Sequence, residues 1–144
     1  MIGSLSGESG SVFAYTSIQL GLLTLIKHGL FSLSENMIEK HLWILSNLVL
    51  DKSPETAQRI VLEEGLVEKV LELTQNKDSE IEKEAFFCLA GLTGCNQVAI
   101  VLMLLDKKLL TYYTPKLVES SETTINYSKI NLILDSLIKI LELL

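Results

Sequence analysis

The sequence predicts an all-α fold in which similar helical units are stacked on one another. Leu, Ile, Glu and Lys dominate the composition, whereas the chain has two prolines and 6% aromatic residues, a balance that favours helix over sheet. Segments about one repeat length apart resemble each other, as expected for stacked units. With 144 residues, 48% of them apolar, the chain is long enough for one domain with a substantial core.

The internal repeat is clearest between the first and middle thirds of the chain. The stretch "LEEGLVEKVLEL" lies opposite "IQLGLLTLIKHG", which places Gly65 over Gly21 at an offset of 65 − 21 = 44. The same offset places "FFCLAGL" over "LWILSNL". A weaker third copy, "LLDKKLLTYYTPKLVESS", has Lys108 in the glycine position, and "LDSLIKI" matches "FFCLAGL" at 137 − 89 = 48. The additional residues of this copy predict a larger loop at "ESSETTINYSK".

Each unit is expected to contain three helices. In the middle unit these are 54–64, 66–74 and 79–92, with Pro54 near a helix start, Gly65 just past a helix end and "NKDSE" supplying a turn and a cap. The segment 12–26 predicts two buried helices. Because one such unit cannot bury its apolar faces alone, stacking is required. We expect a flexible leader at 1–10 and repeats at about 11–51, 52–94 and 95–144.

The middle unit resembles the armadillo repeat over the whole of "ETAQRIVLEEGLVEKVLELTQNKDSEIEKEAFFCLAGL", and "WILSN" resembles the W-x-x-x-N element of the importin-α family of nuclear-import adapters. The resemblance covers about 11–144. It implies a right-handed α-solenoid of about three armadillo-like repeats, and "INLILDSLIKIL" resembles the third helix of a late repeat, so the chain matches the C-terminal repeats of that family.

The resemblance also implies a peptide groove along the third helices, which recognises basic nuclear localisation signals. In that groove Trp43 would cover the aliphatic stem of a Lys or Arg, because an indole face attracts a cation. Asn47, one turn away on the same face, would bracket the peptide backbone, because a carboxamide offers both a donor and an acceptor. We expect Asn36 to continue the groove. Glu80 and Glu84 would either meet the cationic heads or form a solvated face, and Phe87 would either extend the aromatic surface or pack in the core.

Two of the three units depart from the W-x-x-x-N pattern. The middle unit has Phe87 and Gly91 at these positions, and the last unit has Asp135 and Lys139. Lys40 and Lys139 on the same faces would repel basic side chains. The sequence therefore predicts a partial groove that engages two or three ligand residues.

Several function classes are disfavoured by the sequence. A net charge of −6 and a pI near 4.9 argue against binding to nucleic-acid phosphates. Motifs of hydrolases, nucleotide-binding enzymes and metalloproteases are absent, so we expect no enzyme and no cofactor. Two histidines and two cysteines without ligand spacing predict no metal site, and Cys88 reads as a buried structural thiol. The longest apolar passage is interrupted by polar residues and short for a bilayer span, so no membrane association is expected.

The implied partners are basic peptide segments of cargo proteins and, from the family, transport receptors of the importin-β/export class, in the cytoplasm and nucleus. Nothing basic precedes Lys27, so the basic arm with which importin-α adapters bind importin-β is missing. We therefore expect either a fragment of a longer protein or an incomplete adapter. The alternative is an armadillo scaffold that binds folded partners and has no import role, with Trp43 packed inward.

Overall fold

The computed structural model describes residues 15–50, 53–122 and 127–144, and within these ranges the elements are α-helices joined by short turns, without a strand. The predicted all-α class is therefore confirmed. The expected leader at 1–10 lies outside the described residues. The helices are a short one at 15–19, α2 (Leu22–Leu30), α3 (Glu35–Leu48), α4 (Pro54–Leu62), α5 (Leu66–Leu73), α6 (Ser79–Thr93), α7 (Val98–Asp106), α8 (Leu109–Glu122) and α9 (Tyr127–Leu143).

The helices of the middle unit begin where the sequence places capping residues. Ser53 accepts a hydrogen bond from the Thr56 N–H, with Pro54 at the first helical position of α4. Asp78 accepts hydrogen bonds from two N–H groups at the start of α6. Both arrangements satisfy backbone donors that have no partner within the helix. The helix bounds consequently agree with the predicted 54–64, 66–74 and 79–92 to within two residues.

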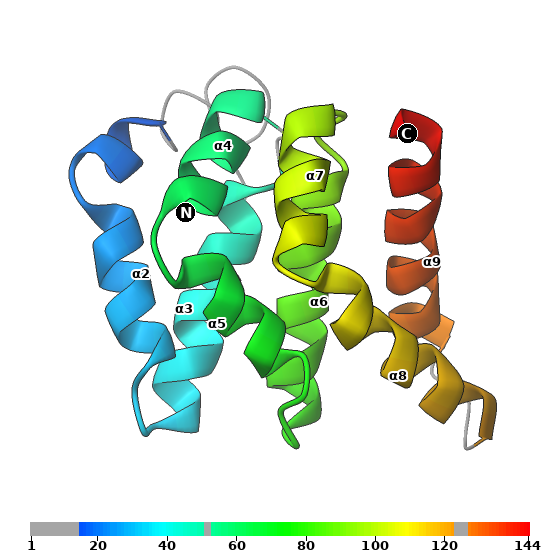
Figure 1. Cartoon of the computed structure of the whole chain (residues 1–144). Helices are drawn as coiled ribbons and strands as arrows, with labels where there is room; N and C mark the ends of the chain where they lie inside the picture. The colour runs from blue at the N-terminus through cyan, green and yellow to red at the C-terminus, as the bar shows by residue number, and fades with distance from the viewer. Residues whose placement is uncertain (1–14, 51–52, 123–126) are drawn as a thin grey trace.

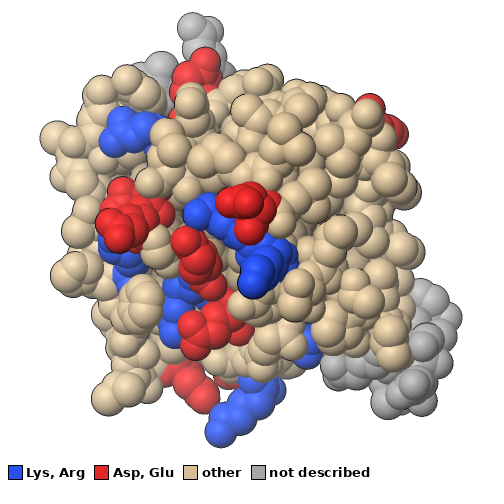
Figure 2. Space-filling view, viewed as in Figure 1, with Lys and Arg blue, Asp and Glu red and all other residues tan. Residues whose placement is uncertain are grey.

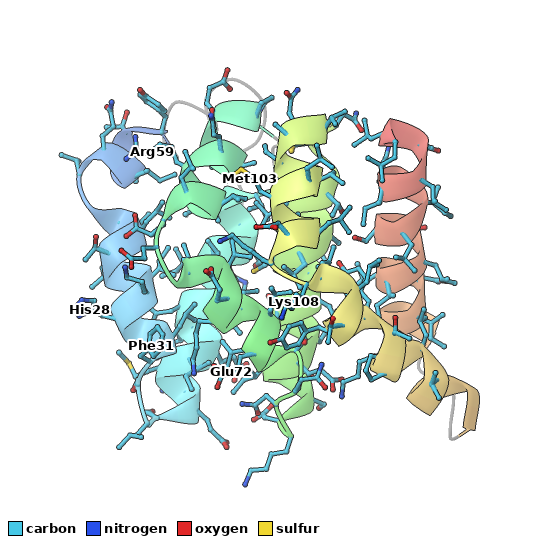
Figure 3. The ribbon with its side chains drawn as sticks, in the orientation of Figure 1. His28, Phe31, Arg59, Glu72, Met103 and Lys108 are labelled. Carbon is cyan, nitrogen blue, oxygen red and sulfur yellow. The ribbon has the colours of Figure 1, made fainter. Side chains whose placement is uncertain are left out.

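The junction between the first and second helix of each unit has a residue in the left-handed region. Gly21 has φ 97°, Gly65 has φ 79° and Lys108 has φ 69°. Figure 3 shows Lys108 where α7 turns into α8. Glycine adopts this backbone without a steric penalty, whereas Lys108 does so against the contact between its Cβ and the backbone. The alignment of Lys108 with the two glycines therefore corresponds to one shared turn.

Corresponding helices of successive units lie side by side (Figure 1). Among first helices α4 contacts α7, among second helices α5 contacts both α2 and α8, and among third helices α6 contacts both α3 and α9. Leu, Ile and Val side chains from all three units form one continuous buried core. The described chain is therefore a stack of three similar three-helix units.

Ion pairs also connect neighbouring units. The Lys27 ammonium lies 3.3 Å from the Glu63 carboxylate, and Lys107 lies 3.2 Å from Glu68. Lys116 on α8 lies 2.8 Å from Glu82 on α6, and both of these side chains are largely buried. A short, shielded pair resists screening by salt better than an exposed one. The pair between α8 and α6 therefore ties the last unit to the middle one.

A matched change of side-chain size distinguishes the first unit from the middle one. His41 occupies the position of Ala85, as the repeat offset predicts, and Gly29 occupies the position of Leu73. Gly29 is buried, and a Cβ added there would overlap the imidazole of His41. The first unit thus combines a large and a small residue where the middle unit has the reverse, which keeps the packed volume similar.

The last unit differs from its prediction in one respect. The segment "ESSETTINYSK" was expected to be a loop, but α8 continues to Glu122 and α9 begins at Tyr127, so the prediction of a long loop is wrong. Pro115 lies inside α8 and does not end it, because the proline ring holds φ in the helical range while removing one backbone donor. The polar composition of this segment therefore did not predict how far the two helices extend.

Candidate functional site

The third helices α3, α6 and α9 carry the predicted site residues on one face, which we call the third-helix face. Residues three or four positions apart lie above one another on a helix. The corresponding rows are Asn36, Lys40, Trp43 and Asn47 on α3, then Glu80, Glu84, Phe87 and Gly91 on α6, then Leu132, Asp135 and Lys139 on α9.

Trp43 and Asn47 are both accessible to a ligand. The Trp43 side chain is 43% exposed, so it is not the core residue that the scaffold alternative required. The Asn47 Nδ2 donates a hydrogen bond to the Trp43 carbonyl oxygen at 2.8 Å, and Asn47 is half-buried. This bond uses one of the two amide hydrogens, so one donor and the Oδ1 acceptor remain for a peptide backbone.

The polar residues of the two rows have different surroundings. Asn36 and Glu80 are exposed in the first turns of α3 and α6. At this end of a helix the dipole stabilises a negative charge such as the Glu80 carboxylate. Glu84 is half-buried, and its charge adds to burial in raising the pKa of the Cys88 thiol. Cys88 is fully buried, as predicted. Glu84 is therefore the better-positioned of the two carboxylates to act beside the aromatic residues.

Phe86 and Phe87 are adjacent in sequence and have opposite environments. Phe86 is 1% exposed and its ring lies 5.7 Å from that of Tyr113, whereas Phe87 is 38% exposed. The expected placement of Phe87 on an accessible surface is thus observed. It occupies on α6 the position that Trp43 occupies on the neighbouring helix α3.

An apolar pocket of about 400 Å³ lies between α6 and α9 and was not predicted. Its lining includes both substituted positions of the middle unit, Phe87 and Gly91, and both of the last unit, Asp135 and Lys139. Leu50 and Ile138 add exposed apolar surface. The sequence shows that these four positions depart from the W-x-x-x-N pattern. Only the contact between α6 and α9 shows that they surround one space.

The packing around Gly91 explains why the middle unit does not have an asparagine there, where the first unit has Asn47. A Cβ at Gly91 would lie 2.5 Å from Cγ2 of Val49 and 3.0 Å from its Cβ. Contacts this short force one group to move. The close approach of Val49 therefore excludes a side chain at Gly91, and the space beside Gly91 stays open toward α9.

A chain of buried hydroxyl groups joins α6, α8 and α9 next to this pocket. Thr93 Oγ1 donates to the Ala90 carbonyl oxygen at 2.9 Å and lies 2.9 Å from Ser136 Oγ, which lies 2.8 Å from Tyr113 Oη. Since each hydroxyl has one hydrogen, Ser136 must donate to Thr93 and Tyr113 must donate to Ser136. Burial raises the pKa of Tyr113, which keeps this donor protonated. No hydroxyl hydrogen of the chain is left for a ligand.

The charged residues at the pocket are unequally engaged. Lys139 lies 3.7 Å from the Glu142 carboxylate on the same helix. Asp135 is exposed, and its carboxylate forms no ion pair with any described residue. The pocket therefore combines an apolar interior with one available negative charge.

The face of the molecule seen in Figure 2 has an uneven distribution of charge. Figure 2 shows charged side chains gathered over α2, α4 and α5 and a mostly uncharged surface over α7 to α9. A hollow of about 530 Å³ on the charged part is lined by Lys27, His28, Phe31 and the turn before α5. His28 and Phe31 project from α2 (Figure 3). The Lys27 ammonium is already bound by Glu63 and the Glu64 carbonyl, so it is less available to a ligand in this hollow.

The described residues contain neither a metal-binding cluster nor a membrane-spanning helix. Within 15–50, 53–122 and 127–144 there is no cluster of three or more His, Cys, Asp or Glu residues arranged to hold a metal ion. In the same ranges, no helix combines the length and the apolar character needed to cross a bilayer.

Comparison with known proteins gives a structural neighbour. No protein-family model matches the chain, and no curated protein sequence matches it. The fold is similar to that in a crystal structure of an engineered protein, with a TM-score of 0.75 and 21% sequence identity over 90% of this chain. The match covers 49% of the engineered protein, so this chain spans about half of its length. At this identity the similarity concerns the fold alone.

Proposed function

We propose that the three stacked units are armadillo-like repeats in a right-handed solenoid and that the third-helix face binds an extended basic peptide. Three-helix units with a shared left-handed turn and helix-to-helix stacking support the repeat assignment. Under this proposal the chain is a binding module of the importin-α type rather than an enzyme. It acts between cytoplasm and nucleus on basic segments of cargo proteins and on transport receptors.

The observation that carries the proposal is the pairing of exposed aromatic rings with carboxylates on adjacent helices. Trp43 and Phe87 are both accessible, and Glu84 lies one turn before Phe87 on the same helix face. A Lys or Arg stem packed on an aromatic ring, with its charged head near a carboxylate, gains from both contacts. Lys40 lies on the same face and limits the number of basic residues that can bind.

Asn47 supports the same mode of binding. Its unused amide hydrogen and Oδ1 can pair with the N–H and C=O of one peptide unit, which holds an extended backbone beside the Trp43 ring. Asn36 and Glu80, at the exposed start of their helices, extend the surface by one turn. The site is then short, with one well-equipped position on α3 and a second on α6.

The proposal is tested by titrating a Lys/Arg-rich localisation peptide while following the fluorescence of Trp43, the only tryptophan of the chain. Saturable change is expected, weaker at high salt because the charges are partly exposed. Asn47→Ala and Glu84→Gln should each weaken binding by about threefold to tenfold, in line with buried and rim contacts of interfaces.

Glu72→Gln is the control, because Glu72 is an exposed carboxylate on α5, not on a third helix, and pairs there with Lys69. This variant should bind as the wild type does. A charge-matched scrambled peptide should bind more weakly. If the indole emission is unchanged and calorimetry also shows no affinity, the basic-peptide proposal is wrong.

A second candidate is a surface for a folded protein partner. Exposed apolar side chains extend over the last unit, including Leu102, Leu110, Val118 and Leu141, and Figure 2 shows little charge there. Exposed apolar side chains mark a protein interface where they form a continuous patch. A basic peptide would not compete for a partner bound at this surface, which separates the two functions.

A further inference from the structure

We propose that the pocket between α6 and α9 binds an apolar side chain of the same peptide whose basic residue packs on Trp43 and Phe87. This inference rests on the proposed function and specifies its ligand further. The ligand would be an extended segment with a Lys or Arg and, a few residues away, a side chain of the size of Leu, Ile, Met or Phe.

The pocket is large enough to hold one apolar side chain of a peptide. Its volume of about 400 Å³ lies in the lower part of the range of ligand pockets, roughly 300–1,000 Å³. Its lining includes Gly91, which contributes no side chain, and Val49, whose methyl group already occupies the place of a Cβ at position 91. In the first unit the position of Gly91 is held by Asn47, so the middle unit has no backbone-binding amide here and has an apolar pocket beside this position instead.

The chemistry of the lining favours an apolar occupant. Phe87, Leu132 and Ile138 contribute apolar surface. The two lining hydroxyls already donate their hydrogens, Thr93 to the Ala90 carbonyl oxygen and Ser136 to Thr93. A polar side chain entering the pocket would lose water without gaining a hydroxyl donor, which is unfavourable.

Charge complementarity identifies the partner as a basic peptide. Asp135 lines the pocket, is exposed, and pairs with no cation among the described residues. Lys139 lies next to Glu142 on its own helix, which reduces its repulsion of a cationic ligand. A Lys or Arg flanking the apolar anchor would therefore find a carboxylate, whereas an acidic flanking residue would be repelled.

The repeat spacing sets the distance between the two anchors. Packed helices lie about 8–10 Å apart, and an extended chain advances about 3.3–3.6 Å per residue. One step from the α3–α6 junction to the α6–α9 junction therefore corresponds to about three residues of peptide. The apolar residue should follow or precede the basic one by that spacing.

The experiment uses the full chain labelled with ¹⁵N and two peptides. One carries a Lys-Arg pair with a leucine three positions away, on the carboxyl or the amino side in separate syntheses, and the other has serine in place of the leucine. Affinity is measured by fluorescence anisotropy. The Trp43 indole N–H and the amides of Gly91 and Ile138 report separately on the two anchors.

We expect the leucine peptide of one direction to bind at least fivefold more tightly than the serine peptide and to shift both sets of signals. Ile138→Ala should remove this preference. Leu134→Ala is the matched control, because Leu134 is an exposed aliphatic residue of the same helix, 41% accessible against 51% for Ile138, and does not line the pocket. Asp135→Asn should weaken both peptides about equally.

The outcomes separate the two levels of the proposal. If the indole signal moves but leucine and serine peptides bind equally, the apolar-anchor inference is overturned and the proposed function stands. Shifts at Gly91 and Ile138 without any at the indole would overturn the basic-peptide function and leave an apolar site. No shift at either place overturns both. A wild-type dimer dissociated by Ile138→Ala would show instead that a second copy fills the pocket.

Discussion

The two junctions on the third-helix face, α3 with α6 and α6 with α9, have the same arrangement of helices but differ in how closely their side chains pack. Between α3 and α6, Val49 packs so closely on Gly91 that a Cβ has no room. Between α6 and α9, the buried hydroxyls of Tyr113, Ser136 and Thr93 connect the helices, and a pocket of about 400 Å³ remains beside them. Repeated helices thus fix where side chains meet, while residue size decides whether the junction closes or opens.

The largest expected effect is the difference in stability between a variant of Phe86, which lies in the core, and a variant of Phe87, which lies on the third-helix face. Phe86→Ala removes a buried ring and should destabilise the protein by about 3–5 kcal/mol. Phe87→Ala should change stability by less than about 1 kcal/mol, because its ring is partly exposed, and should weaken peptide binding. Denaturant unfolding measures the first effect and anisotropy the second. Similar unfolding midpoints for both variants would contradict the assignment of the two faces.

A larger residue at position 91 tests the close packing between α3 and α6. Gly91→Asn should destabilise the protein by about 1–3 kcal/mol, because the new side chain collides with Val49. Adding Val49→Ala should recover part of this loss, although it also removes buried methyl groups. Thermal unfolding of the single and double variants measures the coupling between them. If Gly91→Asn is as stable as the wild type, the close approach does not exclude a side chain there.

The direction of the hydrogen bonds in the hydroxyl chain between α6, α8 and α9 predicts which of two variants loses more stability. Ser136→Ala leaves the buried Tyr113 donor without its acceptor and should destabilise by about 1–3 kcal/mol. Tyr113→Phe removes a donor and leaves only an acceptor short of a partner, so a smaller loss of about 0.5–1.5 kcal/mol is expected. Chemical unfolding of both variants provides the comparison. The reverse order would mean that the hydrogens run in the other direction.

The turn shared by the three units predicts two effects of opposite sign. Lys108→Gly should stabilise the protein by about 1 kcal/mol, because it relieves a left-handed backbone at a non-glycine residue. Gly65→Ala should destabilise by about 1–2 kcal/mol for the same reason, since no atom lies within 4 Å of an added Cβ. Melting temperatures of the two variants should shift in opposite directions. Shifts of the same sign would refute a common turn.

Much of the fold could be predicted from local signals. The positions of Pro54, Gly65 and Asp78 marked helix ends because capping depends on nearby residues, and the middle-unit helices lie within two residues of their predicted bounds. The polar segment after Pro115 was misjudged, because composition reports exposure more directly than backbone conformation. The burial of Cys88 followed from its place in the helical pattern.

The candidate site was only partly predictable. Trp43, Asn47, Glu84 and Phe87 could be assigned to one face because helical spacing is regular. The sequence could not show that Phe87 and Asp135, which are 135 − 87 = 48 positions apart, line one pocket. It also could not show why position 91 has a glycine where the first unit has Asn47, since the reason is a contact with Val49 from another unit.

By itself, the sequence determined the helical class, the repeat offset and the residues of each helix face, because these depend on propensity, capping and periodicity within a few turns. Only the tertiary structure decided which faces meet, how closely α3 approaches α6, and that α6 and α9 leave a cavity with an available carboxylate. These features depend on the side-chain volumes of residues distant in the chain, and such volumes act only when the helices are packed together.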